Sequence, residues 1–73
     1  MDAKEEEAVM AAIRAALKKL RTDRGIGIED FYNDTGIHIG RIETSSPGIT
    51  IYTLHRICKY YNITVKEFFN TYC

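Results

Sequence analysis

A helical repeat of apolar residues near the start of the chain most constrains the fold. Apolar side chains recur there at intervals of three and four residues, which places them on one face of an α-helix: Val9, Ile13, Ala16, Leu17 and Leu20. Acidic residues gather before this repeat and basic residues gather in its second half, which is the order that the helix dipole favours. Gly25 is well suited to end the helix, with Arg24 in the last turn. The pattern predicts one long helix up to this glycine.

Four shorter helices are predicted after Gly25, and no segment has the alternation of a strand. The segments from Ile28 to Asp34 and from Ile37 to Thr44 are separated by Thr35-Gly36, and Ser45-Ser46-Pro47-Gly48 forms a loop by composition. Thr50 can cap the fourth helix, and Asn62 can close it in the left-handed conformation. Thr64 and Glu67 form a capping box at the start of the fifth. The expected core side chains of the later helices are Phe31, Ile39, Ile42, Ile51, Leu54, Ile57, Cys58, Tyr61, Val65 and Phe68. The chain is therefore predicted to be compact and all-α.

Size and charge limit the classes of protein to consider. The chain has 73 residues with ten basic and ten acidic side chains, which predicts one small neutral domain, residues 1–73. We expect residues 1–11 to extend the first helix and residues 12–69 to form the core. No apolar run approaches the ~20 residues that cross a bilayer, and the acidic start does not resemble a signal peptide. Two cysteines are too few for a disulfide framework, which favours the cytoplasm.

Several fragments, taken in order, resemble one family of regulators. Leu20–Ile26 is similar to the end of helix 1 in helix-turn-helix proteins of the phage lambda repressor and Cro type, the XRE family. Ile39–Glu43 resembles the end of their recognition helix, and the spacing from Glu43 through Lys59 matches their path into helix 4. Asn62–Phe68 is similar to the start of helix 5. The resemblance implies a five-helix lambda repressor-like domain that binds double-stranded DNA as a homodimer and regulates transcription, most often as a repressor.

Three positions depart from the family pattern. The interval from Phe31 to Glu43 is about three residues shorter than in the family, so the turn and the recognition helix must be compressed. Ile28 stands where these proteins often have a polar residue that contacts a phosphate. Tyr32 stands where a small alanine lets the two helices pack closely. We expect these departures to alter how the domain docks on DNA.

The resemblance implies a shortened recognition helix at Thr35–Glu43, lying in the major groove. Arg41 can bridge the two major-groove acceptors of guanine, although a solvated surface arginine is the alternative. His38 lies three residues earlier on the same face and can donate to a phosphate or a purine, or have no role in DNA binding. Thr35 can cap this helix and face a phosphate. The following polar loop contacts the DNA backbone in the family but would also form an ordinary turn. The predicted DNA-binding residues are Thr35, His38, Arg41, Thr44, Ser45 and Ser46.

Arg21 and Glu43 are expected to have a structural role. In the proteins that this chain resembles, the equivalent residues form an ion pair between helix 1 and the end of the recognition helix. The resemblance therefore implies that Arg21 is partly buried and paired with Glu43.

Other functions find less support in the sequence. His55 and Cys58 have a spacing that can share a metal ion, but too few further ligands exist, and Cys58 is equally a small core residue. No phosphate-binding loop or catalytic triad is recognisable, so we predict no enzyme, no catalytic residues, no metal and no cofactor.

The alternative is a protein-interaction module. Aromatic residues crowd the last third of the chain, and Tyr60, Phe69 and Tyr72 are candidates for an exposed patch that pairs two subunits or binds a toxin. The first half of helix 1, with Val9 and Met10, is a second candidate for a dimer surface. An antitoxin with weak or no DNA binding is therefore also consistent with the sequence.

Overall fold

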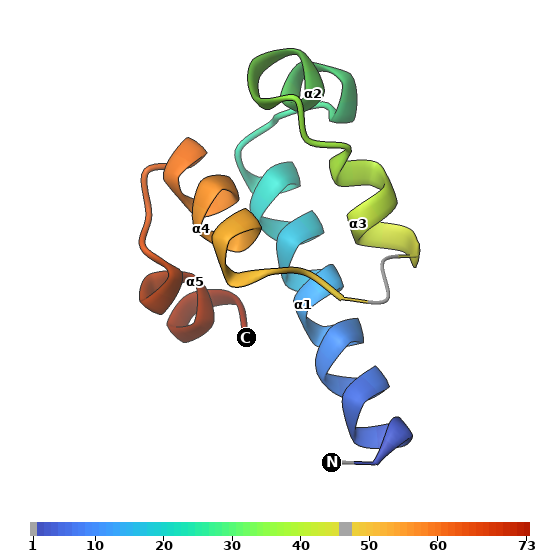
Figure 1. The fold of residues 1–73 in the computed structure, drawn as a ribbon. Coiled ribbons are helices and arrows are strands. Elements are labelled where there is room, and N and C mark those ends of the chain that lie inside the picture. The colour runs from blue at the N-terminus through green and yellow to red at the C-terminus, as the bar shows by residue number, and fades with distance from the viewer. Residues whose placement is uncertain (1, 46–47) are drawn as a thin grey trace.

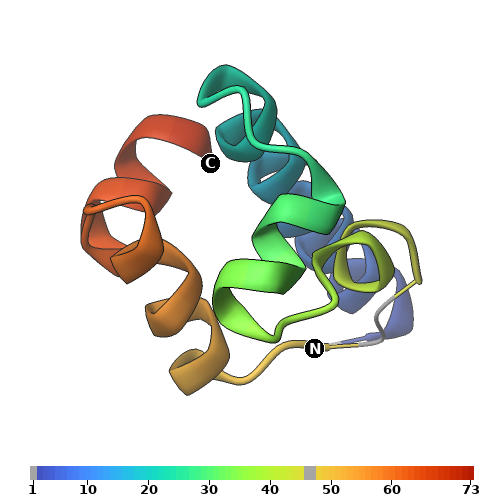
Figure 2. The same cartoon turned by 90° about the horizontal axis from the view of Figure 1, so that it is seen from above.

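The computed structural model describes residues 2–45 and 48–73, apart from the side chain of Ser45. The described residues form the five predicted helices and no strand (Figure 1): α1 (Ala3–Asp23), α2 (Ile28–Thr35), α3 (Ile39–Ser45), α4 (Ile51–Tyr60) and α5 (Val65–Tyr72). The second half of α1 is central: α3 packs on one side of it and α5 on another (Figures 1 and 2). The all-α prediction is confirmed.

Helix α1 extends beyond the region where the other helices pack against it. Its first residues are capped by Asp2, whose Oδ1 accepts a hydrogen bond from the Glu5 amide at 2.8 Å. Its first half projects beyond the other helices (Figure 1), and its second half contributes Ala16, Leu17 and Leu20 to the core. Gly25, at φ +67°, follows the end of the helix in the left-handed conformation, as predicted.

The core gathers apolar side chains from all five helices and from the turn before α3. Its fully or nearly fully buried members are Ala16, Leu17, Leu20, Phe31, Ile37, Ile39, Leu54, Ile57, Cys58, Tyr61 and Phe68. Ile51, by contrast, is 71% exposed, so its predicted place in the core stripe of α4 is wrong. It is the first residue of α4.

Aromatic rings join α2 to the end of α4. Phe31 lies fully buried, with its ring centroid 4.8 Å from that of Tyr60 and 5.7 Å from that of Tyr61. The Tyr60 hydroxyl donates a hydrogen bond of 2.6 Å to Asp34. Helix α2 has only eight residues, and a helix this short is not stable on its backbone hydrogen bonds alone. These side-chain contacts therefore stabilise it.

The predicted signals at the ends of α4 and α5 are confirmed. Thr50 accepts a hydrogen bond from the Thr53 amide, and Asn62 has a φ of +61° just after α4. Thr64 and Glu67 form both hydrogen bonds of the capping box, each 3.0 Å long. These local contacts fix the sharp turn that folds α5 back toward α1.

Candidate nucleic-acid interface

The start of the predicted recognition helix is wrong. Thr35 ends α2 instead of opening α3: its hydroxyl donates to the Phe31 carbonyl at 2.7 Å and accepts from the Ile37 amide. Gly36 then adopts a φ of +75°, which closes α2. The first hydrogen bonds of α3 run from the amides of Arg41 and Ile42 to the His38 carbonyl. The helix that follows the turn is therefore Ile39–Ser45 rather than a helix beginning at Thr35, and Thr35 does not cap it.

Helices α2 and α3 approach each other at a glycine. A Cβ atom placed on Gly40 would lie 3.3 Å from Cγ2 of Ile28, so only a residue without a side chain fits here without displacing Ile28. Tyr32 therefore need not be small. It is 43% exposed, and its ring stacks on that of His38 with centroids 4.4 Å apart. The small residue that close packing needs lies on α3, not on α2.

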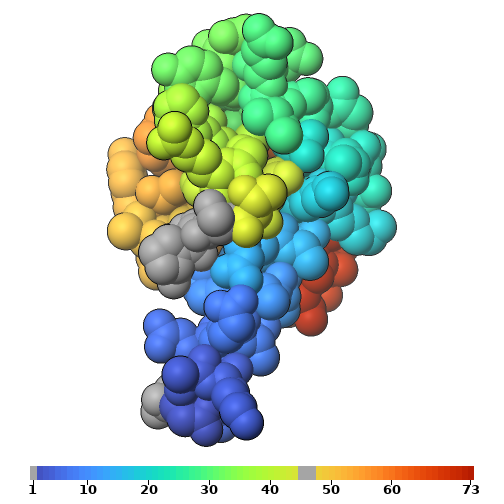
Figure 3. All heavy atoms as spheres, turned by 90° about the vertical axis from the view of Figure 1, so that its right-hand side faces the viewer, coloured from blue at the N-terminus to red at the C-terminus, as the bar shows by residue number. Residues whose placement is uncertain are grey.

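The predicted DNA-binding residues do not all lie alike. Arg41, His38 and Thr44 are exposed, whereas Thr35 is partly buried. The Thr44 hydroxyl donates to the Gly40 carbonyl at 2.8 Å. The side chain of Ser45 and all of Ser46 lie outside the described residues. Figure 3 shows α3, coloured yellow-green to yellow, on the surface of the molecule, so its outer side is accessible.

Arg21 and Glu43 lie together between α1 and α3. Nε and Nη2 of Arg21 donate to the two carboxylate oxygens of Glu43 at 2.8 and 3.0 Å, which makes the pair bidentate. The third direction of the guanidinium is also used, because Nη1 donates to the Ile26 carbonyl at 2.9 Å. The Arg21 side chain is 10% exposed and that of Glu43 is 3% exposed. The hydrogen bond to Glu43 raises the pKa of Arg21 above its already high value, so the guanidinium stays charged.

Two contacts that were not predicted from the sequence connect α4 to the end of α2. Arg56 donates to the Thr35 carbonyl at 3.0 Å, and Tyr60 donates to Asp34. Both partners lie immediately before the turn into α3. Glu29, Asp30 and Asp34 of α2 are exposed. No spacing rule identifies these long-range contacts, because the two helices are about twenty residues apart in the chain.

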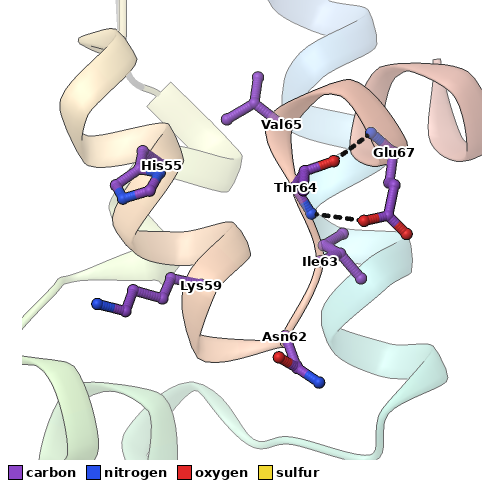
Figure 4. Close-up of a pocket in the computed structure, with 7 residues that line it drawn as sticks. All are labelled: His55, Lys59, Asn62, Ile63, Thr64, Val65 and Glu67. Carbon is purple, nitrogen blue, oxygen red and sulfur yellow. Dashed lines mark hydrogen bonds between the residues drawn. The ribbon is translucent and has the colours of Figure 1, made fainter.

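The rival sites have a different geometry. An open hollow of about 590 Å³ lies between α4 and the start of α5 (Figure 4), and none of the predicted DNA-binding residues lines it. Cys58 is buried, whereas His55 is exposed, so the two do not share an accessible site. Among the described residues, no three His, Cys, Asp or Glu side chains form a group that could hold a metal ion. None of the described helices is long and apolar enough to cross a membrane.

The exposed aromatic patch is only partly present. Phe69 is 39% exposed, but Tyr60 and Tyr72 are half-buried and pack against the core. Tyr60 is also engaged with Asp34. Among the large apolar side chains of the described residues, the two with the highest exposed fractions are instead on α4: Ile51 at 71% and Tyr52 at 70%.

A short helix, a tight turn and a second helix whose outer side is accessible define a helix-turn-helix DNA-binding domain. Comparison with protein families identifies the same class: residues 16–73 match the Cro/C1-type HTH DNA-binding domain. The chain belongs to this family and is a DNA-binding regulator. No curated protein and no solved structure matched the chain.

Proposed function

We propose that the protein is a sequence-specific DNA-binding repressor that places α3 in the major groove. The Arg21–Glu43 pair is the observation that best supports this proposal. It holds Glu43 against α1, and residues two apart in a helix point in nearly opposite directions, about 200° apart. Arg41 is therefore directed away from the body of the molecule, where it is exposed.

Arg41 is the proposed base-reading residue, and His38 supports it. A guanidinium paired with the two acceptors of guanine contributes ~1–3 kcal/mol of discrimination between bases. His38 lies at the start of α3, where its stacking on Tyr32 limits the positions that the imidazole can take. From there it can donate to a phosphate or to a purine acceptor.

The threonines are weaker candidates for phosphate contacts. A phosphate oxygen only accepts hydrogen bonds, but the hydroxyls of Thr35 and Thr44 already donate to the carbonyls of Phe31 and Gly40. Each would have to release that bond before it could donate to DNA. We therefore propose Arg41 and His38 as the principal contacts and assign Thr35 no role in DNA binding.

Selection from a random double-stranded DNA library tests this function. The wild-type protein should enrich one motif, and Arg41→Ala should lose the preference at one base pair of it. Lys66→Ala is the matched control, because Lys66 is an exposed cation on α5, outside α3. No enriched motif with the wild-type protein would refute sequence-specific binding, and the same motif with Arg41→Ala would refute its role as the reader.

The mode of action that we propose is steric. A homodimer in the cytoplasm would bind two half-sites about one DNA turn apart, ~34 Å, and exclude the polymerase. Transcription in vitro from a promoter that contains the selected motif should then fall as the protein is added. A rise in transcription would make the protein an activator instead.

A further inference from the structure

The first two turns of α1 present an acidic face that no other described helix covers. Asp2, Glu5, Glu6 and Val9 follow the spacing i, i+3, i+4, i+7, which places them side by side on one face of a helix. All four are exposed, Val9 at 48%. Lys4 lies two residues from Asp2 and from Glu6, and therefore on the opposite side. We call these four residues the acidic face; it lies on the half of α1 that projects from the body (Figure 1).

The outer side of α4 is the chemical counterpart of the acidic face. Tyr52, His55, Arg56 and Lys59 have the same spacing, i, i+3, i+4, i+7, and all four are exposed. We call them the basic face. The helix contains no acidic residue. Tyr52 is 70% exposed, and its ring centroid lies 6.5 Å from that of His55. Lys59 and His55 border the open hollow beside α5 (Figure 4), so space remains around this face.

The two faces match residue by residue when the helices run antiparallel. In that register the apolar ends meet and every carboxylate faces a basic or imidazole side chain: Val9 with Tyr52, Glu6 with His55, Glu5 with Arg56 and Asp2 with Lys59. Because α1 is one continuous helix, its first turns extend away from the body and do not fold back on the α4 of the same chain. An acidic face that pairs with this basic face must therefore come from another molecule.

We propose that the acidic face of one copy of this chain packs antiparallel on the basic face of a second copy. Two acidic faces cannot pair with each other, because six carboxylates would then meet. When each copy contributes both faces, the contact is reciprocal about a twofold axis and closes a dimer. The proposal rests on the homodimer of the proposed function and assigns its surface.

Sedimentation equilibrium without DNA tests this surface, with Cys73→Ser in every variant to prevent crosslinking through that exposed thiol. The parent chain should form dimers whose affinity falls as salt rises from about 0.05 M to about 0.5 M. Two variants reverse matching positions of the two faces separately: Asp2→Lys with Glu6→Lys, and His55→Glu with Lys59→Glu. Each should weaken self-association by about tenfold or more. Lys66→Glu, a charge reversal outside both faces, should dimerise like the parent.

Mixing the two reversed variants is the decisive measurement. Each variant alone opposes like charges in two of the three charged pairs of each contact. In the mixture one contact keeps the native pairs and the other has two pairs with their charges exchanged, so both contacts are attractive and dimers should form. Circular dichroism of both variants is the control, and both should remain helical. A monomeric parent chain, or a mixture that stays monomeric while both variants are folded, would overturn the proposal. Loss of DNA affinity with unchanged dimerisation in the His55→Glu, Lys59→Glu variant would also overturn it and assign the basic face to DNA.

The outcome is separable from that of the proposed function. Self-association is measured without DNA, and Arg41 lies on α3, outside both faces. A dimer that enriches no DNA motif would refute the DNA-binding proposal and leave this one standing. A monomer that enriches a motif would do the reverse.

Discussion

Removing the charge of Glu43 should strongly destabilise the fold. In Glu43→Gln the amide oxygen can still accept one hydrogen bond from Arg21, but the amide nitrogen opposes a second guanidinium donor. Arg21 stays ionised, and the residue as a whole is 8% exposed. Its charge is therefore left without an opposite charge in a nearly buried position. Breaking a buried pair in this way costs ~3–5 kcal/mol. We expect the lower end, about 3 kcal/mol, because the bond from Arg21 to the Ile26 carbonyl remains.

That loss is large for a chain of this size. At ~0.05–0.15 kcal/mol per residue, the free energy of unfolding of 73 residues is about 4–11 kcal/mol. Glu43→Gln should therefore lower the midpoint of urea unfolding, followed by circular dichroism, far outside experimental error. The midpoint should not recover in high salt, because a nearly buried pair is weakly screened.

A double variant shows whether the stranded charge is the cause. Arg21→Met with Glu43→Leu removes both charges and keeps similar volumes, so it should be close to the wild type in stability or above it. An unfolding midpoint of Glu43→Gln that equals the wild-type value would refute this reasoning, because the pair would then contribute nothing. Equal losses in the single and double variants would instead attribute the effect to packing.

Two further predictions concern Tyr61 and the cysteines. Burial raises the pKa of Tyr61 to about 12 in the folded protein, whereas its pKa in the unfolded chain is near 10. The unfolded chain therefore loses this proton first. The free energy of unfolding should fall as pH rises from about 10 through 12, by at most about 2.7 kcal/mol. Urea titrations of Tyr61→Phe should show a smaller fall in stability over this pH range. The substitution should cost nothing at neutral pH, because the hydroxyl has no hydrogen-bond partner in the described part of the chain. Wild-type and Tyr61→Phe stabilities that change in parallel with pH would contradict this. Oxidation should join two chains through Cys73, which is exposed, and spare Cys58, which is buried and cannot reach a second chain. A crosslinked band on a non-reducing gel that persists in Cys73→Ser would contradict this.

Local signals in the sequence predicted the helices well. Caps at Thr50 and Thr64, and left-handed residues at Gly25 and Asn62, depend on hydrogen bonds within a few residues, so the sequence contains all the information they need. The order of the fragments was sufficient to predict the Cro/C1-type family. Contacts such as Arg56 with the Thr35 carbonyl could not be predicted, because nothing in either segment specifies its distant partner.

The start of the recognition helix was predicted wrongly because Thr35 satisfies two competing rules. A threonine before a glycine can open a helix as an N-cap or close one through its own hydroxyl and a left-handed glycine. The periodicity of so short a segment does not decide between them. In the structure the Phe31 ring packs on the rings of Tyr60 and Tyr61, and these contacts stabilise α2 up to Thr35. Thr35 therefore closes α2.

The contact between α2 and α3 has a consequence for function. Gly40 is the small residue at this contact, beside Ile28, and the bulky Tyr32 of α2 stacks on His38. Gly40 lowers the intrinsic helical propensity of α3 by ~1 kcal/mol relative to alanine, in a helix of only seven residues. Such a helix depends on its tertiary contacts, and the bidentate pair between Arg21 and Glu43 is one of them. The pair also orients α3, and Arg41 with it, so a variant that breaks this pair should weaken DNA binding before the domain has unfolded.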